Sequence, residues 1–276
     1  MAISINTNVM SMNAQRNLGR TQSSMATSLQ RLSSGLRVNS AKDDAAGLAI
    51  AERMNSQVRG LTVGIRNAND GISLSQTAEA ALGSVTESLQ RMRELAVQAV
   101  NGTNSTTDRA SLDSEFQALD TELTRVINGT EFNNIAILSG GAGQTTFQIG
   151  ANTGVNNQIS VTTTNMATDG TITTINSAAV TTAATASASI ASIDAALTKV
   201  NTERGTLGAA QSSIESAIRS LSATRENISA ARGRIMDADF AVETSNLTRT
   251  QILQQAGIAM LSQANSAPQV ALSLLQ

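Results

Sequence analysis

The fold is decided by residues 54–99, which read MNSQVRGLTVGIRNANDGISLSQTAEAALGSVTESLQRMRELAVQA. Apolar residues or alanines recur along this stretch at steps of four and three, with one slipped step at Ser75. This spacing is typical of a helix that packs against other helices along one seam. Residues 40–43 are predicted to cap its start, with Asp43 in the first turn, and Asn101-Gly102 to end it. A helix over about residues 44–100 is roughly 85 Å long. The seam consists of Met54, Val58, Leu61, Ile65, Ala68, Ile72, Ala78, Leu82, Val85, Leu89, Met92, Ala96 and Ala99.

Two further stretches have the same helical spacing. One predicts a helix over about residues 105–127, ended by Asn128-Gly129, and the other a helix over about residues 187–235. The only proline is Pro268, so the chain is almost free of residues that interrupt helices. Three seams in one chain predict a mainly α fold, a long antiparallel helical bundle or coiled coil with the N- and C-terminal helices paired.

Residues 140–186 have a different composition, rich in Gly, Thr, Asn and Ser. Apolar residues alternate with polar ones at Phe147 and Ile149 and again at Ile159 and Val161, and the connection between them is turn-forming. This pattern predicts a small β-hairpin. A further short strand is predicted at Thr171–Ile175.

The two ends of the chain carry more apolar helix surface than one partner helix covers. We divide the chain into an N-terminal segment (1–43), core helices with the hairpin (44–186), a returning core helix (187–235) and a C-terminal segment (236–276). Ordering the two end segments, about 84 residues, costs on the order of 1–2 kcal/mol each in backbone entropy. A contact between two helices alone does not offset that, so we predict end segments that are disordered in the monomer and ordered in an assembly of copies. The predicted assembly residues are Leu18, Met25, Leu29, Leu32, Leu36, Leu253, Ala256, Met260, Val270 and Leu274, while Ile252, Ile258 and Leu261 fall on other faces.

Composition argues against an enzyme. The 276 residues include no His and no Cys, which excludes the usual zinc sites, a Ser-His-Asp triad and a thiol nucleophile. No cofactor or metal site is expected. The acidic pair Asp43-Asp44 lies at a helix start, where carboxylates are favoured for structural reasons. Asp237 and Asp239 are two residues apart and point to different sides of a helix. The sequence therefore offers no catalytic residue.

Charge and hydropathy leave few partners other than the protein itself. A formal charge of −2, with no basic patch among aromatic residues, argues against nucleic-acid binding. No window approaches 18 apolar residues, so no membrane insertion is expected. The first residues lack the pattern of a cleavable signal peptide, so export would need a dedicated machine.

Two glycine patterns receive structural interpretations. Gly140, Gly141 and Gly143 lack the lysine and helix that follow a phosphate-binding loop, so we interpret them as a turn. Gly60 and Gly64 have the spacing of a membrane-helix dimer motif, but their flanks are charged. Close helix packing is the modest alternative for that pair.

Several long motifs resemble bacterial flagellin. They are 32–50 (LSSGLRVNSAKDDAAGLAI), 90–98 (QRMRELAVQ), 131–133 (EFN), 147–151 (FQIGA) and nearly all of 235–276. The resemblance covers about 150 N-terminal and 90 C-terminal residues, and motifs of this length are highly specific.

The resemblance implies a structural subunit that polymerises into the flagellar filament for swimming. It implies that the end segments form a paired inner layer lining the channel, that the long helices and hairpin form the next layer, and that the protein is secreted to the extracellular filament. The implied partners are further copies, the flagellar type III export apparatus, an export chaperone, and the filament cap and hook-junction proteins. About 25 residues separate the hairpin from the third helix, so little outer layer is expected.

The resemblance also implies a recognition site for the vertebrate Toll-like receptor for flagellin. Its Arg and Leu fall at Arg91 and Leu95, and its Glu at Glu115 on the neighbouring helix. The alternative is ordinary structure: Leu95 as packing, and Arg91 with Glu115 as an ion pair. We expect the free subunit, and not the filament, to be recognised.

Three other kinds of protein are alternatives to a filament subunit, and each differs from it in a testable way. A hook–filament junction protein has flagellin-like ends but is made in few copies. An enzyme-bearing flagellin needs an inserted His-Glu-x-x-His, which a chain without His does not contain. A membrane-inserting translocator needs an apolar span.

Overall fold

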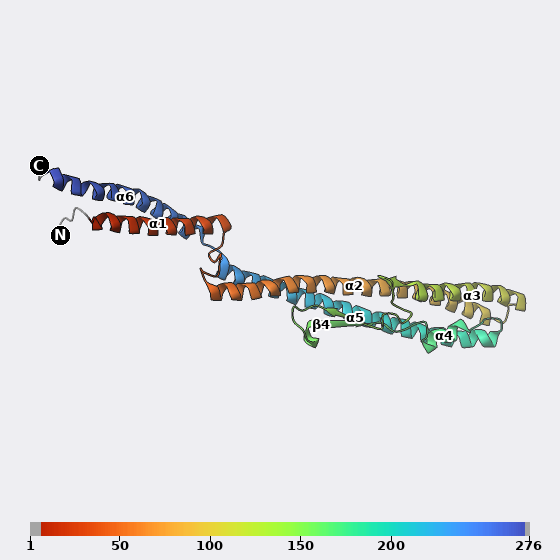
Figure 1. Ribbon diagram of the computed structural model, residues 1–276. Coiled ribbons are helices and arrows are strands. Elements are labelled where there is room, and N and C mark those ends of the chain that lie inside the picture. The colour runs from red at the N-terminus through yellow and green to blue at the C-terminus, as the bar shows by residue number, and fades with distance from the viewer. Residues whose placement is uncertain (1–6, 274–276) are drawn as a thin grey trace. The chain divides into compact units, whose positions relative to one another are not determined.

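The computed structural model describes residues 7–273, which fall into two compact units (Figure 1). The first unit combines residues 1–56 with residues 227–276, and the second consists of residues 57–226. Two long helices, α2 (Ala45–Val100) and α5 (Ala183–Met236), contribute to both units. Each unit is described by itself below.

Three long helices form the body of the second unit: α2, α3 (Thr106–Gly129) and α5. The helices predicted over 44–100, 105–127 and 187–235 are confirmed, because each observed end lies within four residues of its predicted position. Their facing sides bury aliphatic side chains and alanines along narrow seams, and Phe116 is the largest fully buried side chain. The fully buried seam includes Ala68, Ala78, Leu82, Leu89, Met92, Ala96, Ala99, Leu123, Ile193, Val200, Leu207 and Ile214.

The slipped step in the α2 seam has a simple local solution. Ser75 is fully buried, and its hydroxyl donates to the Gly71 carbonyl at 2.8 Å, so the polar atom is satisfied within the helix. The neighbouring Leu74 is also buried and supplies apolar volume at this level of the seam.

The turn between α2 and α3 is fixed by polar contacts. Ser105 and Asp108 form a reciprocal capping box at the start of α3. Arg109 then reaches back, and its Nε donates to the Ala99 carbonyl at 2.8 Å, which satisfies a free acceptor at the end of α2. The sequence signal for the α2 stop, Asn101-Gly102, lies in this turn.

Two small antiparallel strand pairs pack on the helices. The predicted hairpin is confirmed as β3 (Gln144–Gln148) and β4 (Gln158–Thr162), with Phe147 opposite Ile159. Its connection contains the short helix η1 (Val155–Asn157). The second pair, β1 (Glu131–Phe132) and β2 (Ile135–Ala136), was not predicted. Asn133 and Asn134, both at positive φ, form its tight turn.

The strand predicted at Thr171–Ile175 is wrong, because these residues lie in a helix, α4 (Gly170–Asn176). The side chain of Asp169 caps it by accepting from the Thr171 amide at 3.0 Å. Ile172 and Ile175 are three residues apart and both buried, as expected of one helical face. Cap and burial together outweigh the β-branched composition.

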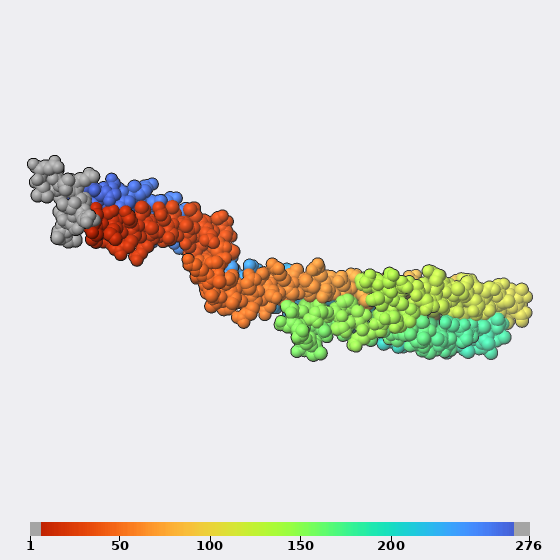
Figure 2. Space-filling model, viewed as in Figure 1, coloured from red at the N-terminus to blue at the C-terminus, as the bar shows by residue number. Residues whose placement is uncertain are grey.

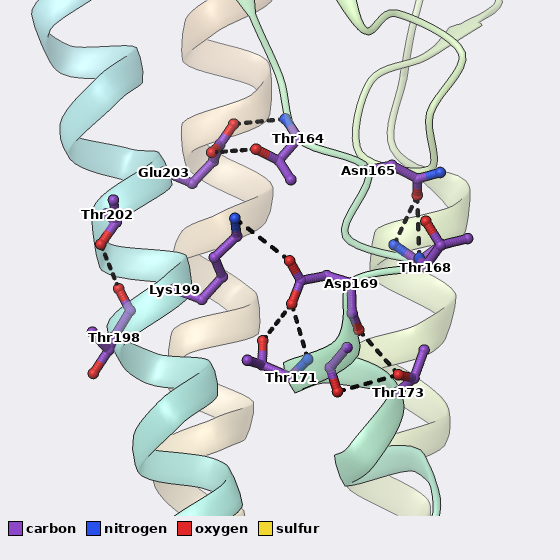
Figure 3. Close-up of polar contacts among 12 residues, drawn as sticks. Thr164, Asn165, Thr168, Asp169, Thr171, Thr173, Thr198, Lys199, Thr202 and Glu203 are labelled. Carbon is purple, nitrogen blue, oxygen red and sulfur yellow. Dashed lines mark hydrogen bonds and ion pairs between the residues drawn. The ribbon is translucent and has the colours of Figure 1, made fainter.

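The segment between β4 and α4 is tied to α5 by two carboxylate contacts (Figure 3). Glu203 of α5 is buried and accepts from both the amide and the hydroxyl of Thr164, each at 2.7 Å. Lys199, one turn away, pairs with Asp169 at 3.5 Å. Asp169 also accepts from Thr171, and these hydrogen bonds, more than Lys199, hold the pKa of its carboxyl below the usual value.

The first unit contains α1 (Val9–Ser34), α6 (Phe240–Ser273) and the adjoining ends of α2 and α5. A bridge between Leu36 and Asp237 joins the two connecting segments, and Val38, Ala51 and Met236 form a small core beside it.

The predicted cap of α2 is wrong in its position. Asp43 accepts from the amide and hydroxyl of Ser40 in a separate turn. Asp44 then accepts from the Gly47 amide at 2.8 Å, so Asp44 is the side chain that satisfies a free donor at the start of α2.

Candidate functional site: the paired terminal helices

Helices α1 and α6 lie side by side and run in opposite directions (Figure 1). Two contacts near the ends of the pair define its register. Asn8 Nδ2 donates to the Ala264 carbonyl at 2.7 Å, and Arg31 Nη1 lies 3.6 Å from Glu243 Oε2. Residues 8 and 31 are separated by about 35 Å of helix, so one register is maintained over that length.

The side chains buried between α1 and α6 are small or polar. Glu243, Thr250 and Ala264 recur at seven and fourteen residues along α6 and face Ser11 and Ser28 of α1. Glu243 has a side chain only 9% exposed, and Arg31 is its ion-pair partner. The larger apolar residues at the same helical spacing are only half-buried, so this seam contributes less hydrophobic stabilisation than the fully buried seams of the second unit. They are Leu18, Met25 and Leu32 of α1 and Leu247 and Leu261 of α6.

Other large apolar side chains of the pair point away from this seam. On α6, Val242, Leu253 and Met260 are exposed and lie eleven and seven residues apart, so they share one face of the helix, here called the α6 stripe. Thr244, Thr248 and Gln255 lie on the opposite side of the helix, outside the stripe. Exposed apolar surface of this extent marks an interaction site. The exposed large apolar residues of the pair are Val9, Met10, Met12, Leu29, Phe240, Val242, Ile252, Leu253, Ile258 and Met260.

The predicted assembly residues do not share one seam. On α1, Leu18, Met25, Leu32 and the following Leu36 are half-buried, whereas Leu29 is 49% exposed. On α6, Leu253, Ala256 and Met260 are all exposed. Leu274 lies outside the described residues, and so does the side chain of Val270. Spacing identified the apolar residues but not which of them α1 and α6 use against each other.

The glycine pair Gly60 and Gly64 packs against the end of the β-hairpin and its connecting loop, and not against another helix. A Cβ at Gly64 would lie 1.9 Å from the Ile149 carbonyl oxygen, and one at Gly60 would lie 2.7 Å from Ala151 Cβ. One turn further on, Asn67 Nδ2 donates to the Gln148 carbonyl at 2.7 Å. The hairpin backbone is therefore seated directly on α2, and its connecting loop protrudes from the surface of the second unit (Figure 2).

The three residues predicted for receptor recognition differ in exposure. Arg91 and Glu115 have side chains about half exposed, and Arg91 donates to Glu115 through Nε and Nη2 and to Glu94 through Nη1. The hydrogen bonds to Glu115 first, and to Glu94 second, raise the pKa of Arg91. Leu95, in contrast, is 1% exposed and belongs to the core of the second unit.

Two properties of the described residues, 7–273, concern membranes and metal ions. None of the helices there is long and apolar enough to cross a membrane. No group of three or more Asp or Glu in this range is placed to hold a metal ion.

Comparisons with known proteins agree along the whole chain. Residues 5–142 match the bacterial flagellin N-terminal helical region, and residues 190–275 match the bacterial flagellin C-terminal helical region. A flagellin of Halalkalibacterium halodurans is 44% identical over 272 residues, which cover 99% of each chain. Flagellin A of Vibrio anguillarum is 34% identical over an alignment of 379 positions that covers all of both chains.

A solved structure gives the same result. The crystal structure of Bacillus cereus flagellin has a TM-score of 0.50 and 30% identity, and the match covers 60% of this chain and 94% of that one. Full-length flagellin relatives imply polymerisation of copies and a place in the flagellar filament, and they do not favour a hook–filament junction protein. The chain thus belongs to the bacterial flagellin family, whose members are structural subunits of the filament.

Proposed function

We propose that the exposed apolar side chains of α1 and α6 are the surface through which copies of this chain pack in the filament. The observation that carries the proposal is the inverted distribution in the pair: Ser, Thr and Glu are buried, while Leu253, Ile258 and Met260 are exposed. Burying such side chains against further copies contributes about 1.5–3 kcal/mol for each one fully covered. The role is structural and needs no catalytic group or cofactor.

Seeded growth of filaments tests this proposal. Leu253→Glu places a charge in the α6 stripe, and Gln255→Glu places the same charge outside the stripe on the same helix. We expect Leu253→Glu to reduce filament extension by at least about tenfold, because a buried unpaired carboxylate is strongly unfavourable. Gln255→Glu serves as the matched control for added charge. Equal extension by both variants would remove the stripe from the assembly surface.

Membership of the family also supports a route to the cell exterior. We propose that the chain leaves the cell through the flagellar type III export apparatus, assisted by an export chaperone, and is added to the filament between the hook-junction proteins and the cap. A strain that lacks the export apparatus is expected to retain the protein inside the cell. Release of the full-length protein by that strain would contradict this route.

We further propose that the Toll-like receptor for flagellin recognises the free subunit through Arg91 and Glu115. Both side chains are half exposed and form one ion-paired surface across α2 and α3. Leu95 is buried, so its contribution is to position Arg91 one turn away on α2.

A reporter-cell assay separates contact from positioning. Arg91→Ala and Glu115→Ala are expected to reduce activation while leaving the thermal unfolding temperature almost unchanged, because exposed ion pairs contribute little stability. Leu95→Ala is expected to lower the unfolding temperature as well. Full activation by the Arg91→Ala/Glu115→Ala double variant would refute the recognition surface.

A further inference from the structure

Three exposed methionines gather near one end of the α1–α6 pair. Met10 and Met12 of α1 and Met260 of α6 have exposed fractions of 60%, 55% and 62%. Because Asn8 contacts Ala264 in this antiparallel pair, Met12 and Met260, one turn further along each helix, occupy the same level. The three thioethers therefore lie near one end of the pair, and Met10 and Met12, two residues apart, are exposed on different sides of α1.

Three other methionines among the described residues are buried, whereas Met25 and Met54 are half-buried. Met92 and Met166 are fully buried in the second unit, and Met236 is 5% exposed in the small core of the first unit. Since thioether oxidation depends on access to the sulfur, the two groups differ in expected reactivity although they share one chain.

Oxidation changes the property that the assembly surface depends on. A thioether is apolar and flexible, whereas a sulfoxide is polar and accepts hydrogen bonds. Met260 belongs to the α6 stripe with Val242 and Leu253. A sulfoxide at this position therefore puts a polar oxygen where a neighbouring copy would cover the stripe, and that oxygen would be buried without a donor.

We propose that Met10, Met12 and Met260 are oxidation-sensitive residues of the assembly surface. Their oxidation to sulfoxides prevents the free subunit from assembling. In the reaction the thioether sulfur takes one oxygen from hydrogen peroxide, and the O–O bond breaks. The thioether becomes a sulfoxide, and the remaining oxygen leaves as water. The inference rests on the proposed assembly surface. In the assembled filament the same sulfurs are covered and react slowly.

The chemical part of the proposal is tested with hydrogen peroxide on the full chain. Free subunits and preformed filaments receive the same dose, and peptide mass spectrometry measures oxidation at each methionine. In the subunit, Met10, Met12 and Met260 are expected to oxidise at least about tenfold faster than Met92 and Met166, which serve as internal references. In the filament this difference is expected to shrink sharply.

The functional part is tested by seeded extension. Oxidised subunits are expected to lose most of their extension rate, and treatment with methionine sulfoxide reductases, which act on both sulfoxide epimers, is expected to restore it. A Met10→Leu/Met12→Leu/Met260→Leu variant is compared only with its own untreated sample. Its extension rate after peroxide treatment is expected to stay close to its rate before treatment.

The outcomes separate this inference from the proposed function. Failure of untreated subunits to extend seeds would count against the assembly role itself. If untreated subunits extend and subunits with verified sulfoxides at all three positions extend equally well, the inference is wrong. It is also wrong if peroxide inhibits the leucine variant as strongly as the natural sequence, or if the reductases remove the sulfoxides without restoring extension.

Discussion

The second unit and the α1–α6 pair use similar residues in opposite ways. In the second unit, leucines, isoleucines and methionines are buried along seams. In the pair, Ser11, Ser28 and Thr250 are buried, while Leu253 and Met260 are exposed. A segment that buries its apolar side chains internally is stable alone, whereas one that exposes them needs a partner. The difference teaches that the second unit buries its own apolar side chains, whereas the pair leaves apolar side chains uncovered, as the proposed assembly surface requires.

The largest expected effect comes from the same substitution made in each region. Leu89→Ala removes a fully buried side chain of the second unit and should lower the free energy of unfolding of the subunit by about 2–5 kcal/mol. Leu253→Ala removes a half-exposed one and should change it by less than about 0.5 kcal/mol. Calorimetry of the two variants measures both values. Similar losses would erase the distinction between the regions.

A smaller effect is expected at the seat of the hairpin. Gly64→Ala forces a methyl group against the Ile149 carbonyl and should cost about 1–3 kcal/mol. Gly83→Ala, on the same helix with open space around it, should be neutral or stabilising by up to about 1 kcal/mol. Denaturant unfolding compares the two. A neutral Gly64→Ala would show that the hairpin does not depend on this close approach.

The register of the pair depends on Arg31 and Glu243, and its loss should appear mainly in the polymer. Arg31→Glu or Glu243→Arg alone should weaken the assembled filament by roughly 1–3 kcal/mol per subunit, because each leaves like charges facing in a partly buried seam. The double exchange should recover part of that loss. Filament melting temperatures provide the measurement, and a double variant no better than the worse single one would argue against a direct pairing.

The smallest effect concerns helix caps and pH. Asp108 in the α3 capping box has a lowered pKa, because it accepts hydrogen bonds from the Ser105 hydroxyl and amide. Its contribution is therefore present above the unfolded pKa, about 3.9, and is lost as pH falls through the lower folded value. Asn8, which caps α1, has no proton to gain in this range.

Ser105→Ala should cost about 1 kcal/mol at neutral pH and flatten the acid limb of the stability curve of the second unit. Thermal unfolding between pH 2 and 5, followed by circular dichroism, measures the slope of this acid limb in the natural sequence and in the variant. An acid limb that stays as steep in the variant would assign the pH dependence to other carboxyls.

Much of the second unit was predictable because its signals are local. The four-three spacing of α2 and the alternation around Phe147 and Ile159 specify elements without knowledge of their partners. The segment around Thr171 is predicted as a strand because of its β-branched residues, whereas the local cap at Asp169 and the burial of Ile172 and Ile175 on one helical face favour the helix.

The candidate site was less predictable for a physical reason. Spacing places Leu29 and Leu253 on helix faces, but the choice between an internal seam and an external one depends on which side chains fit between two helices. Here Glu243 and Ser28 take the internal positions. Likewise, the sequence left both packing and recognition open for Leu95, and only the fold shows that this residue is buried. Gly64 was recognised as a close-packing position, yet only the fold identifies the hairpin as what it contacts.

Amide hydrogen exchange, measured on dilute subunits and on filaments of the same protein, tests the central claim most directly. Amides of α1 and α6 are expected to exchange rapidly in the subunit, because the pair leaves many of its apolar side chains half or fully exposed, and slowly in the filament, where copies cover them. Amides of the second unit should be slow in both. Slow exchange along α1 and α6 in the dilute subunit would show that the pair is stable without neighbours and would contradict the account.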